Sequence, residues 1–257
     1  MKSALIGYSG FVGGNLASTD SYDLLINRAN LDSIRNQKLD KIVCAGLPAA
    51  KWLANRDPDT DLANTTRLME VLATVSCKQF TLISTIDVYP LSTGRDEDFN
   101  CEQIPNHAYG RHRWQFEQFV RAIFPQAHII RLPALFGPGL KKNVIFDLLH
   151  NNCLETINPE SYFQWYPLDR LQQDIQIVQS QQLALVNLFT QPLATAQILK
   201  RFFPHKIVGE KAGATAHYDL YTKYGKLFNQ ETPHYIMSSS AVLDSLANYL
   251  EMESVSL

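Results

Sequence analysis

Three glycines near the amino terminus are spaced for binding a diphosphate. The heptapeptide that begins at Gly7 follows a short apolar run and opens a helical pattern. Gly7 permits a tight turn, Gly10 lets the backbone approach a pyrophosphate, and Gly13 lets helix and strand pack closely. The free N–H groups at the start of that helix, including those of Phe11 and Val12, would hold the diphosphate. The motif predicts a dinucleotide site, although a glycine-rich turn can also be purely structural.

A polar pair follows the second apolar run, where the adenosine ribose of a dinucleotide would lie. An acidic residue at this place bonds the ribose hydroxyls of NAD, whereas an arginine accommodates the 2′-phosphate of NADP. Asn27 and Arg28 occupy it, and no carboxylate appears before Asp32. Because a guanidinium suits phosphate geometry, the sequence favours NADP over NAD. The alternative is that Arg28 is a solvated loop residue.

The helix that follows Asn106 carries two polar side chains on its apolar face. Asn106 is a good N-cap and Pro125 closes the helix. Residues at three- and four-residue steps share one face, namely Tyr109, Arg113, Phe116, Val120 and Ile123. Such a face is normally all core, so Tyr109 and Arg113 are candidates for chemistry. The alternative is a buried core tyrosine and an exposed arginine.

The elements that must position these residues alternate between strands and helices. Apolar runs rich in Val, Ile and Leu predict strands at Ser3–Ile6, Asp23–Ile26, Lys41–Ala45, Phe80–Ser84, His128–Arg131 and Leu183–Leu188. Helical patterns lie near Val12–Thr19, Asp59–Ser76, His107–Phe124, Asn143–Asn151 and Leu168–Ser180. This alternation predicts an α/β fold with a doubly wound parallel sheet of the Rossmann type.

The carboxy-terminal half is less regular than the amino-terminal half. Prolines divide the chain into shorter pieces after about residue 133, and there is no internal repeat or low-complexity linker. We therefore expect a single domain over residues 1–257. Its Rossmann core would comprise about 1–137 plus 168–202, and a small substrate-binding part about 138–167 and 203–257.

The whole pattern resembles the extended short-chain dehydrogenase/reductase family, the NAD-dependent epimerase/dehydratase group, in a shortened and atypical form. The likeness covers roughly residues 3–138 and, more faintly, 164–175. Aligning Val88-Tyr89 with the family's Val-Tyr puts Thr85 at its catalytic hydroxyl position. Asn64 matches the asparagine before a helical Leu-rich run, and the segment 131–138 resembles Arg-x-x-Asn-x-Tyr-Gly-Pro.

The resemblance implies roles for three residues. In the family a tyrosine is the general acid/base, a Ser or Thr hydroxyl orients the substrate oxygen, and a lysine one helical turn later lowers the tyrosine pKa and holds the nicotinamide ribose. Tyr109, Thr85 and Arg113 would fill these catalytic roles, with Asn64, Tyr109 and Arg113 also near the cofactor. Arg113 stands where the family has lysine and cannot replace its contacts one for one, so lysine at 113 should hold or raise the rate. Ala134 stands where relatives often carry an asparagine near the substrate.

These expectations combine into a function and one alternative. The resemblance implies an NADP-dependent oxidoreductase or epimerase, with NAD as the other cofactor, acting on a hydroxyl or carbonyl of a small metabolite such as a nucleotide sugar. The alternative is a cofactor-binding sensor or scaffold with little turnover, which Arg113 and the short substrate part favour. Fold analogy alone does not decide between them.

Composition excludes several other classes. The net charge of −2 gives no field for gathering nucleic acid or acidic lipid. Glycines interrupt the apolar start, and no run approaches the length of a membrane span, so we expect a soluble, cytoplasmic protein. The four cysteines form no CxxC pair and the seven histidines no ligand spacing, so no metal is expected. The oligomeric state stays open, with a homodimer among the candidates.

Overall fold

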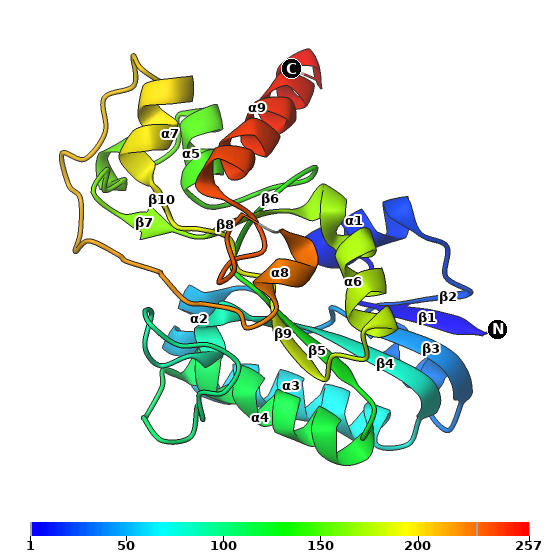
Figure 1. Cartoon of the computed structure of the whole chain (residues 1–257). Helices are drawn as coiled ribbons and strands as arrows, with labels where there is room; N and C mark the ends of the chain where they lie inside the picture. The colour runs from blue at the N-terminus through cyan, green and yellow to red at the C-terminus, as the bar shows by residue number, and fades with distance from the viewer. Residues whose placement is uncertain (1, 230, 257) are drawn as a thin grey trace. The chain divides into compact units, whose positions relative to one another are not determined.

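A six-stranded parallel sheet forms the centre of the larger part of the chain. The computed structural model describes residues 2–229 and 231–256. The strand order is β2-β1-β3-β4-β5-β9 (Figure 1), and every pairing in this sheet is parallel. The strands are β1 Ser3–Ile6, β2 Leu24–Ile26, β3 Lys38–Cys44, β4 Ser76–Thr85, β5 His128–Leu132 and β9 Leu185–Asn187. The order reverses between β1 and β3, and a doubly wound sheet binds ligands at such a switch point.

Helices cover both faces of this sheet, which explains why its strands are apolar on both sides. In Figure 1, α3 and α4 lie against one face and α1 and α6 against the other. All five residues of β5 are buried. The helices are α1 Phe11–Thr19, α2 Lys51–Arg56, α3 Pro58–Leu72, α4 Ala108–Ile123 and α6 Leu171–Ser180, with 3-10 turns η1 Leu31–Ile34 and η2 Ile86–Val88. The predicted Rossmann-type fold class is confirmed.

The structure differs from the sequence-based expectations for α3 and α4. The helix expected over Asp59–Ser76 ends at Leu72, because residues from Ser76 already pair with β3. His107, not Asn106, caps α4, since its Nδ1 accepts the Gly110 N–H at 3.0 Å. Ile123 lies on the expected apolar face of α4 but is 42% exposed.

Asn106 is used for something other than the predicted cap. Its amide donates to the carbonyl oxygens of Asp87 and Val88, at 2.9 and 3.1 Å. The side chain therefore ties the start of α4 to the turn that follows β4. The sequence correctly indicated a hydrogen-bonding side chain at the start of α4, but the groups that it bonds are distant in sequence.

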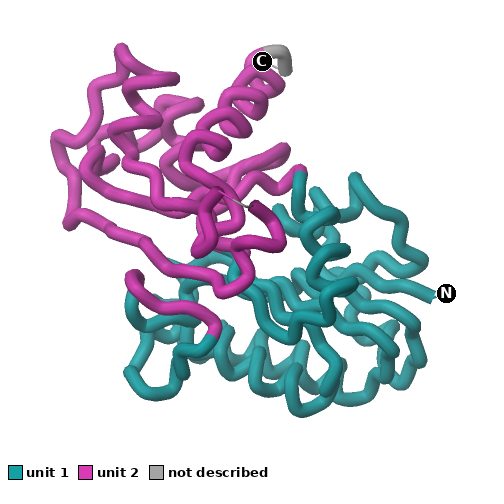
Figure 2. The backbone as a smooth tube through the Cα atoms, in the orientation of Figure 1, with its two compact units in different colours: residues 1–91, 98–132, 170–187 teal, residues 92–97, 133–169, 188–257 magenta. Residues whose placement is uncertain are grey.

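The chain divides into two compact units (Figure 2). The first comprises residues 1–91, 98–132 and 170–187, and the second 92–97, 133–169 and 188–257. The second contains two small sheets, in which β6 Ala134–Phe136 pairs with β8 Trp165–Pro167 and β7 Tyr162–Phe163 pairs with β10 Leu193–Ala194. Its helices are α5 Val144–His150, α7 Thr195–Phe202, α8 Gly225–Phe228 and α9 Ser239–Ser256, and it has 3-10 turns at Leu154–Thr156 and Leu168–Arg170. Arg170, the last residue of the second turn, belongs to the first unit. Residues 133–137 and 188–202, which we expected in the Rossmann core, belong to the second unit.

A buried ion pair fixes α4 against the sheet. Arg131 of β5 donates to Glu117 of α4 at 2.7 Å, and both side chains are fully buried. The Ser84 hydroxyl donates to the same carboxylate at 2.5 Å. Removing one member of such a pair leaves an uncompensated buried charge, so the arrangement holds α4 in register with the carboxyl ends of β4 and β5.

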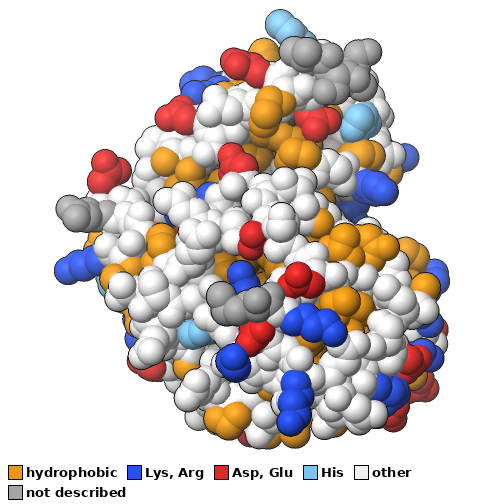
Figure 3. All heavy atoms as spheres, turned by 90° about the vertical axis from the view of Figure 1, so that its right-hand side faces the viewer, with side chains coloured by type: hydrophobic (Ala, Val, Ile, Leu, Met, Phe, Trp, Pro, Cys, Tyr) orange, Lys and Arg blue, Asp and Glu red, His pale blue; other side chains and the backbone are white. Residues whose placement is uncertain are grey.

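The surface carries charges of both signs. Figure 3 shows acidic and basic side chains interspersed on the face that it presents. This distribution agrees with the net charge of −2 and creates no large field of one sign there. Of the helices described, none has the length and apolar character needed to cross a membrane.

Candidate active site

The turn between β1 and α1 requires glycine at two of its three motif positions. Gly7 has φ +90°, and a Cβ there would lie 2.4 Å from the carbonyl oxygen of Ala45. A Cβ at Gly13 would lie 2.0 Å from the carbonyl oxygen of Gly7. At both positions a side chain would collide with the backbone, in agreement with the turn and packing roles predicted for these glycines. Gly10 differs, because its φ is −86° and the nearest atom to a Cβ is 3.3 Å away.

The start of α1 fits the diphosphate of a dinucleotide. Gly10 is its N-cap and supplies no side-chain hydrogen bond, and the first turn, which begins with Phe11 and Val12, contains no acidic residue. Backbone N–H groups at a helix start need acceptors from outside the helix, and an anion provides them. Gly10 is thus the motif position where a side chain would meet the ligand rather than the protein.

The loop after β2 is organised around Asn27. Its Oδ1 accepts the Ala29 N–H at 2.9 Å, and its Nδ2 donates to the Tyr8 hydroxyl at 3.2 Å. Asn27 therefore couples the loop to the glycine turn. Arg28 is exposed next to it. Asn64 lies half-buried on α3, one turn after Asp61.

Thr85 and Tyr109 are brought together at the carboxyl end of β4. The Thr85 side chain is a neighbour of the Tyr109 phenol and acts to lower its pKa, and Thr85 Oγ1 accepts the Asp87 N–H at 3.2 Å. Gly110 makes the approach of α4 to η2 feasible, because a Cβ there would lie 2.1 Å from the carbonyl oxygen of Asp87. The glycine next to Tyr109 is visible in the sequence. The reason for it is not, because the backbone that it contacts lies more than twenty residues earlier in the chain.

Helix α2, which the sequence analysis missed, borders Tyr109. Asn55 Oδ1 accepts the Tyr109 backbone N–H at 3.0 Å. Lys51 Nζ pairs with Asp87 Oδ1 at 2.6 Å. This helix has six residues, too few for a periodic pattern to predict it. Through Asn55 it accepts a backbone N–H at the start of α4, and through Lys51 it places a cation near Tyr109.

Burial decides the pKa of Tyr109. The residue is 7% exposed, and burial raises the phenol pKa above its usual value of 10.0. The charges of Arg113 and Lys51 and the Thr85 hydrogen bond act in the opposite direction but do not outweigh burial. We expected the cation one turn away to lower the pKa of Tyr109. Arg113 does act in that direction, but the pKa as a whole is raised, so the expectation is wrong. Tyr109 is protonated at neutral pH.

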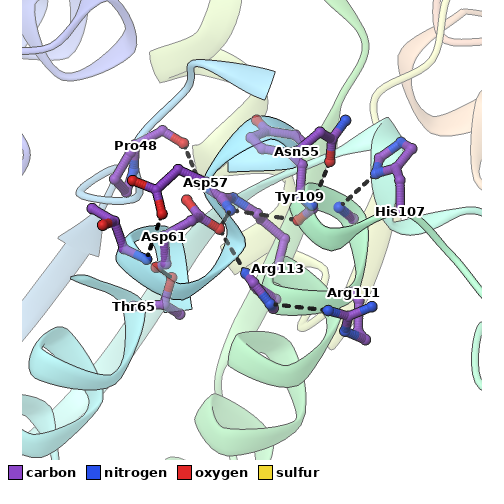
Figure 4. A network of polar contacts seen from close by, with 12 residues as sticks. Pro48, Asn55, Asp57, Asp61, Thr65, His107, Tyr109, Arg111 and Arg113 are labelled. Carbon is purple, nitrogen blue, oxygen red and sulfur yellow. Dashed lines mark hydrogen bonds and ion pairs between the residues drawn. The ribbon is translucent and has the colours of Figure 1, made fainter. Parts of the chain in front are cut away.

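Arg113 is held from three sides in a buried network (Figure 4). One Nη donates to Asp61 and the other to the carbonyl oxygen of Pro48. The guanidinium carbon lies 4.0 Å from the centroid of the Tyr109 ring. Arg113 is 1% exposed, so the alternative of an exposed arginine is wrong. Its Nε is buried without a hydrogen-bond partner in the part of the chain that the structure describes.

Asp61 is the centre of this network. His112 Nδ1 lies 2.7 Å from the carboxylate oxygen that Arg113 also contacts. Burial would raise the Asp61 pKa, but hydrogen bonds from Arg113 and His112 outweigh it and hold the pKa below its usual range. Asp61 was missed in the sequence analysis. The available signal was a carboxylate on the face of α3 that also carries the buried residues Thr65 and Leu68.

Within residues 2–229 and 231–256, no group of three or more His, Cys, Asp or Glu side chains could hold a metal ion.

Comparison with known proteins identifies the family. Residues 18–161 match the model of the NAD dependent epimerase/dehydratase family, more than half of the chain. The chain belongs to this family. The matched region includes Thr85, Tyr109 and Arg113, so the family suggested by the sequence resemblance is confirmed. No curated protein sequence matches the chain.

Solved structures of similar fold are distant in sequence. A UDP-N-acetylglucosamine 4-epimerase from Methanobrevibacter ruminantium M1, in complex with UDP-N-acetylmuramic acid, is 12% identical with a TM-score of 0.77, covering 100% of this chain and 99% of that one. A dTDP-4-dehydrorhamnose reductase from Yersinia enterocolitica is 16% identical with a TM-score of 0.75, covering 98% and 99%. DesIV, a dTDP-glucose 4,6-dehydratase from Streptomyces venezuelae with NAD and TYD bound, is 16% identical with a TM-score of 0.70, covering 98% and 96%. At these identities the likeness shows the fold.

Proposed function

We propose that this member of the family is an NAD(P)-dependent oxidoreductase or epimerase that acts on a hydroxyl or carbonyl of a nucleotide sugar. The observation that carries the proposal is the Thr85–Tyr109 hydroxyl pair at the carboxyl end of β4. This end of the sheet is also where β1 leads into the glycine turn. The likeness to the three enzymes named above, whose own names specify nucleotide-linked sugars, supports this substrate class.

The two hydroxyls have distinct roles in the proposed reaction. When bound, NAD(P) supplies or accepts the hydride. Tyr109 donates its proton to the substrate carbonyl oxygen in reduction and takes a proton from the alcohol in oxidation. Thr85 orients that oxygen. Because burial raises the pKa of Tyr109, the site is better prepared to donate a proton than to accept one.

Turnover with defined substrates tests this proposal. The protein is incubated with NADPH or NADH and a panel of nucleotide-linked 4-keto sugars, simple ketones and aldehydes, while absorbance at the reduced nicotinamide band is followed. Nucleotide-linked sugars with NAD(P)⁺ test oxidation and, by chromatography, epimerisation. Turnover of a nucleotide-linked sugar supports the proposal. Turnover confined to simple carbonyls would contradict the substrate class, and none on any compound would favour the sensor.

Cofactor binding should raise the melting temperature and should depend on Gly10. A ligand that binds only the native state at a hundredfold excess over Kd contributes about 2.7 kcal/mol. We expect Gly10→Val to lose the shift with every form of NAD(P). Its Cβ would lie 3.3 Å from the Gly7 carbonyl oxygen, so the turn must adjust by a few tenths of an ångström, and circular dichroism checks that the variant is folded. Gly14→Val is the matched control on the same helix, since a Cβ there meets nothing closer than 3.6 Å. A shift retained in Gly10→Val would place the diphosphate elsewhere.

The preference for NADP is proposed to rest on Arg28. Its exposed side chain follows β2, and Asn27 holds the loop. We expect calorimetry to show tighter binding of NADPH than NADH, and Arg28→Ala to narrow the difference by about 1.5–3 kcal/mol, the contribution of a charged hydrogen bond. Equal affinity of the unmodified protein for both cofactors would mean that Arg28 does not select NADP.

One observation favours a second candidate function, a cofactor-binding sensor with little turnover. Both Nη groups of Arg113 are engaged by Asp61 and Pro48, so they do not offer the free ammonium of a lysine. A sensor would bind NAD(P) with the same Gly10 dependence but would convert no substrate.

A further inference from the structure

We propose that Asp61 is a positioning residue for Tyr109, acting through Arg113, whose guanidinium it holds over the phenol ring. The inference rests on the proposed function of Tyr109 as the acid/base. It deepens that function by assigning a site role to a residue on α3 that touches neither substrate nor cofactor in the proposed reaction.

The geometry supplies the first argument. Asp61 and Pro48 engage the two Nη groups of Arg113, and the third neighbour is the ring of Tyr109, 4.0 Å from the guanidinium carbon. Figure 4 shows Arg113 between the Asp61 side and the tyrosine. A planar cation with two fixed donor directions has one orientation left, so the carboxylate determines the plane that meets the ring.

The burial of the network supplies the second argument. Asp61, His112 and Arg113 are 5%, 2% and 1% exposed. A buried guanidinium without a carboxylate partner is strongly unfavourable, and the position of the carboxylate therefore decides where the cation can reside. His112 donates to the same oxygen of Asp61 and limits its freedom.

Arginine is the residue that this arrangement needs. A lysine ammonium is a compact charge on a flexible stem and cannot span a carboxylate, a carbonyl oxygen and a ring face at once. The departure from the family's lysine at position 113 and the carboxylate at position 61 are thus two parts of one arrangement.

Other charged groups also act on Tyr109, and the test must separate them. The Arg113 guanidinium lies over the ring, and Lys51 of α2, Asp87 of η2 and Thr85 also act on the pKa of the phenol. His107, in front of α4, has its ring centroid 6.3 Å from that of Tyr109. A substitution at Asp61 leaves Lys51, Asp87, Thr85 and His107 in place, so its effect on Tyr109 is expected to pass through Arg113.

The experiment reads Tyr109 directly, in protein labelled with 13C at the tyrosine Cζ. The chain has eleven tyrosines, and the resonance missing from Tyr109→Phe identifies the one of interest. The variants are Asp61→Asn, which removes the charge, and Asp61→Glu, which keeps the charge but displaces it. Asp59→Asn is the matched control, because Asp59 lies in the same first turn of α3 but is exposed. Circular dichroism confirms that each variant is folded.

We expect Asp61→Asn to move the Tyr109 resonance and to lower the pH at which it titrates, since the guanidinium charge is no longer balanced. Asp61→Glu should move the resonance as well, and Asp59→Asn should leave it in place. On a substrate found by the screen, Asp61→Asn should lower kcat by about tenfold to a hundredfold, as expected for a misplaced catalytic group, with KM nearly unchanged.

Two results would overturn the proposal. One is a folded Asp61→Asn with the wild-type Tyr109 resonance and titration. If that variant does not fold, the same result in folded Asp61→Glu decides against it. The resonance needs no turnover, so it is independent of the proposed reaction. If Tyr109→Phe keeps the full rate while Asp61→Asn still moves the resonance, the proposed function fails and the coupling of Asp61 to Tyr109 stands.

Discussion

Replacement of Tyr109 by phenylalanine should remove turnover while leaving the fold intact. The substitution deletes only the hydroxyl, which neighbours Thr85, and keeps the ring over which the Arg113 guanidinium lies. Positioned acid/base groups contribute about 10²–10⁴-fold to rates, so we expect a loss of that size in kcat. The measurement is the steady-state rate of the variant beside the unmodified protein on a substrate from the screen.

A matched tyrosine provides the control. Tyr22 lies in the same unit, and its buried hydroxyl has no hydrogen-bond partner in the described part of the chain. Tyr22→Phe should therefore keep the full rate, and both variants should keep the circular dichroism spectrum. Equal rates for Tyr109→Phe and the unmodified protein would refute the catalytic assignment.

The pH dependence follows from the raised pKa of Tyr109. Its protonated form prevails at every pH below a value that lies above the usual 10.0. Reduction, which uses the phenol as the acid, should therefore show no loss from this group between about pH 7 and 9. Oxidation, which uses the phenolate as the base, should become faster as pH rises through the same range. A reductive rate that falls with a midpoint near pH 7 would exclude Tyr109 as the proton donor.

The core sheet was predictable because its signals are local. The strands β1 and β5 are almost entirely buried and read as short apolar runs, and the glycine spacing lies within seven residues. The positive φ of Gly7 and the clash that a Cβ at Gly13 would make with Gly7 both arise at the β1–α1 junction itself. Such features need no knowledge of distant contacts.

The surroundings of Tyr109 were not predictable in the same way. Asp61 and Arg113 are 52 residues apart, and Asn55 and Tyr109 are 54 apart. A charged residue in a helical pattern normally indicates a solvated face, and only the packing of α3 against α4 buries it. The net pKa of Tyr109 depends on that burial, so its sign could not be inferred from the sequence spacing of Tyr109 and Arg113.

The carboxy-terminal half was the hardest to read because its elements are short. The strands β7 and β10 have two residues each, and α8 has four. No periodicity can be recognised over such lengths. Residues 188–202 were expected in the Rossmann core because they follow an apolar strand, but β10 pairs with β7 and draws them into the second unit.

Substitutions at Arg113 should be harmful even when they keep the charge. The sequence-based expectation was that Arg113→Lys would hold or raise the rate. The structure favours the opposite result, a lower rate, because a compact ammonium cannot bind Asp61 and the Pro48 carbonyl and also lie over the Tyr109 ring. We expect Arg113→Lys to lower kcat, by an amount similar to that of Asp61→Asn.

Arg113→Met tests the energetic side of the same contact. It leaves the buried Asp61 carboxylate without its guanidinium, and breaking a buried pair in this way reduces the free energy of unfolding by about 3–5 kcal/mol. Because His112 still donates to Asp61, we expect the lower end of that range. Denaturant unfolding at neutral pH measures it. Arg111→Met, which removes an exposed arginine of the same helix, should change stability by less than about 0.5 kcal/mol.

A double substitution separates the loss of the pair from the loss of a side chain. In Asp61→Asn with Arg113→Met, no uncompensated carboxylate remains, so stability should recover relative to Arg113→Met alone. Turnover should not recover with it, because the guanidinium that positions Tyr109 is still missing. If Arg113→Met is as stable as the unmodified protein, the pair does not hold the start of α4. If stability recovers but the rate does not, the Asp61–Arg113 pair is needed to position Tyr109 and not to stabilise the fold.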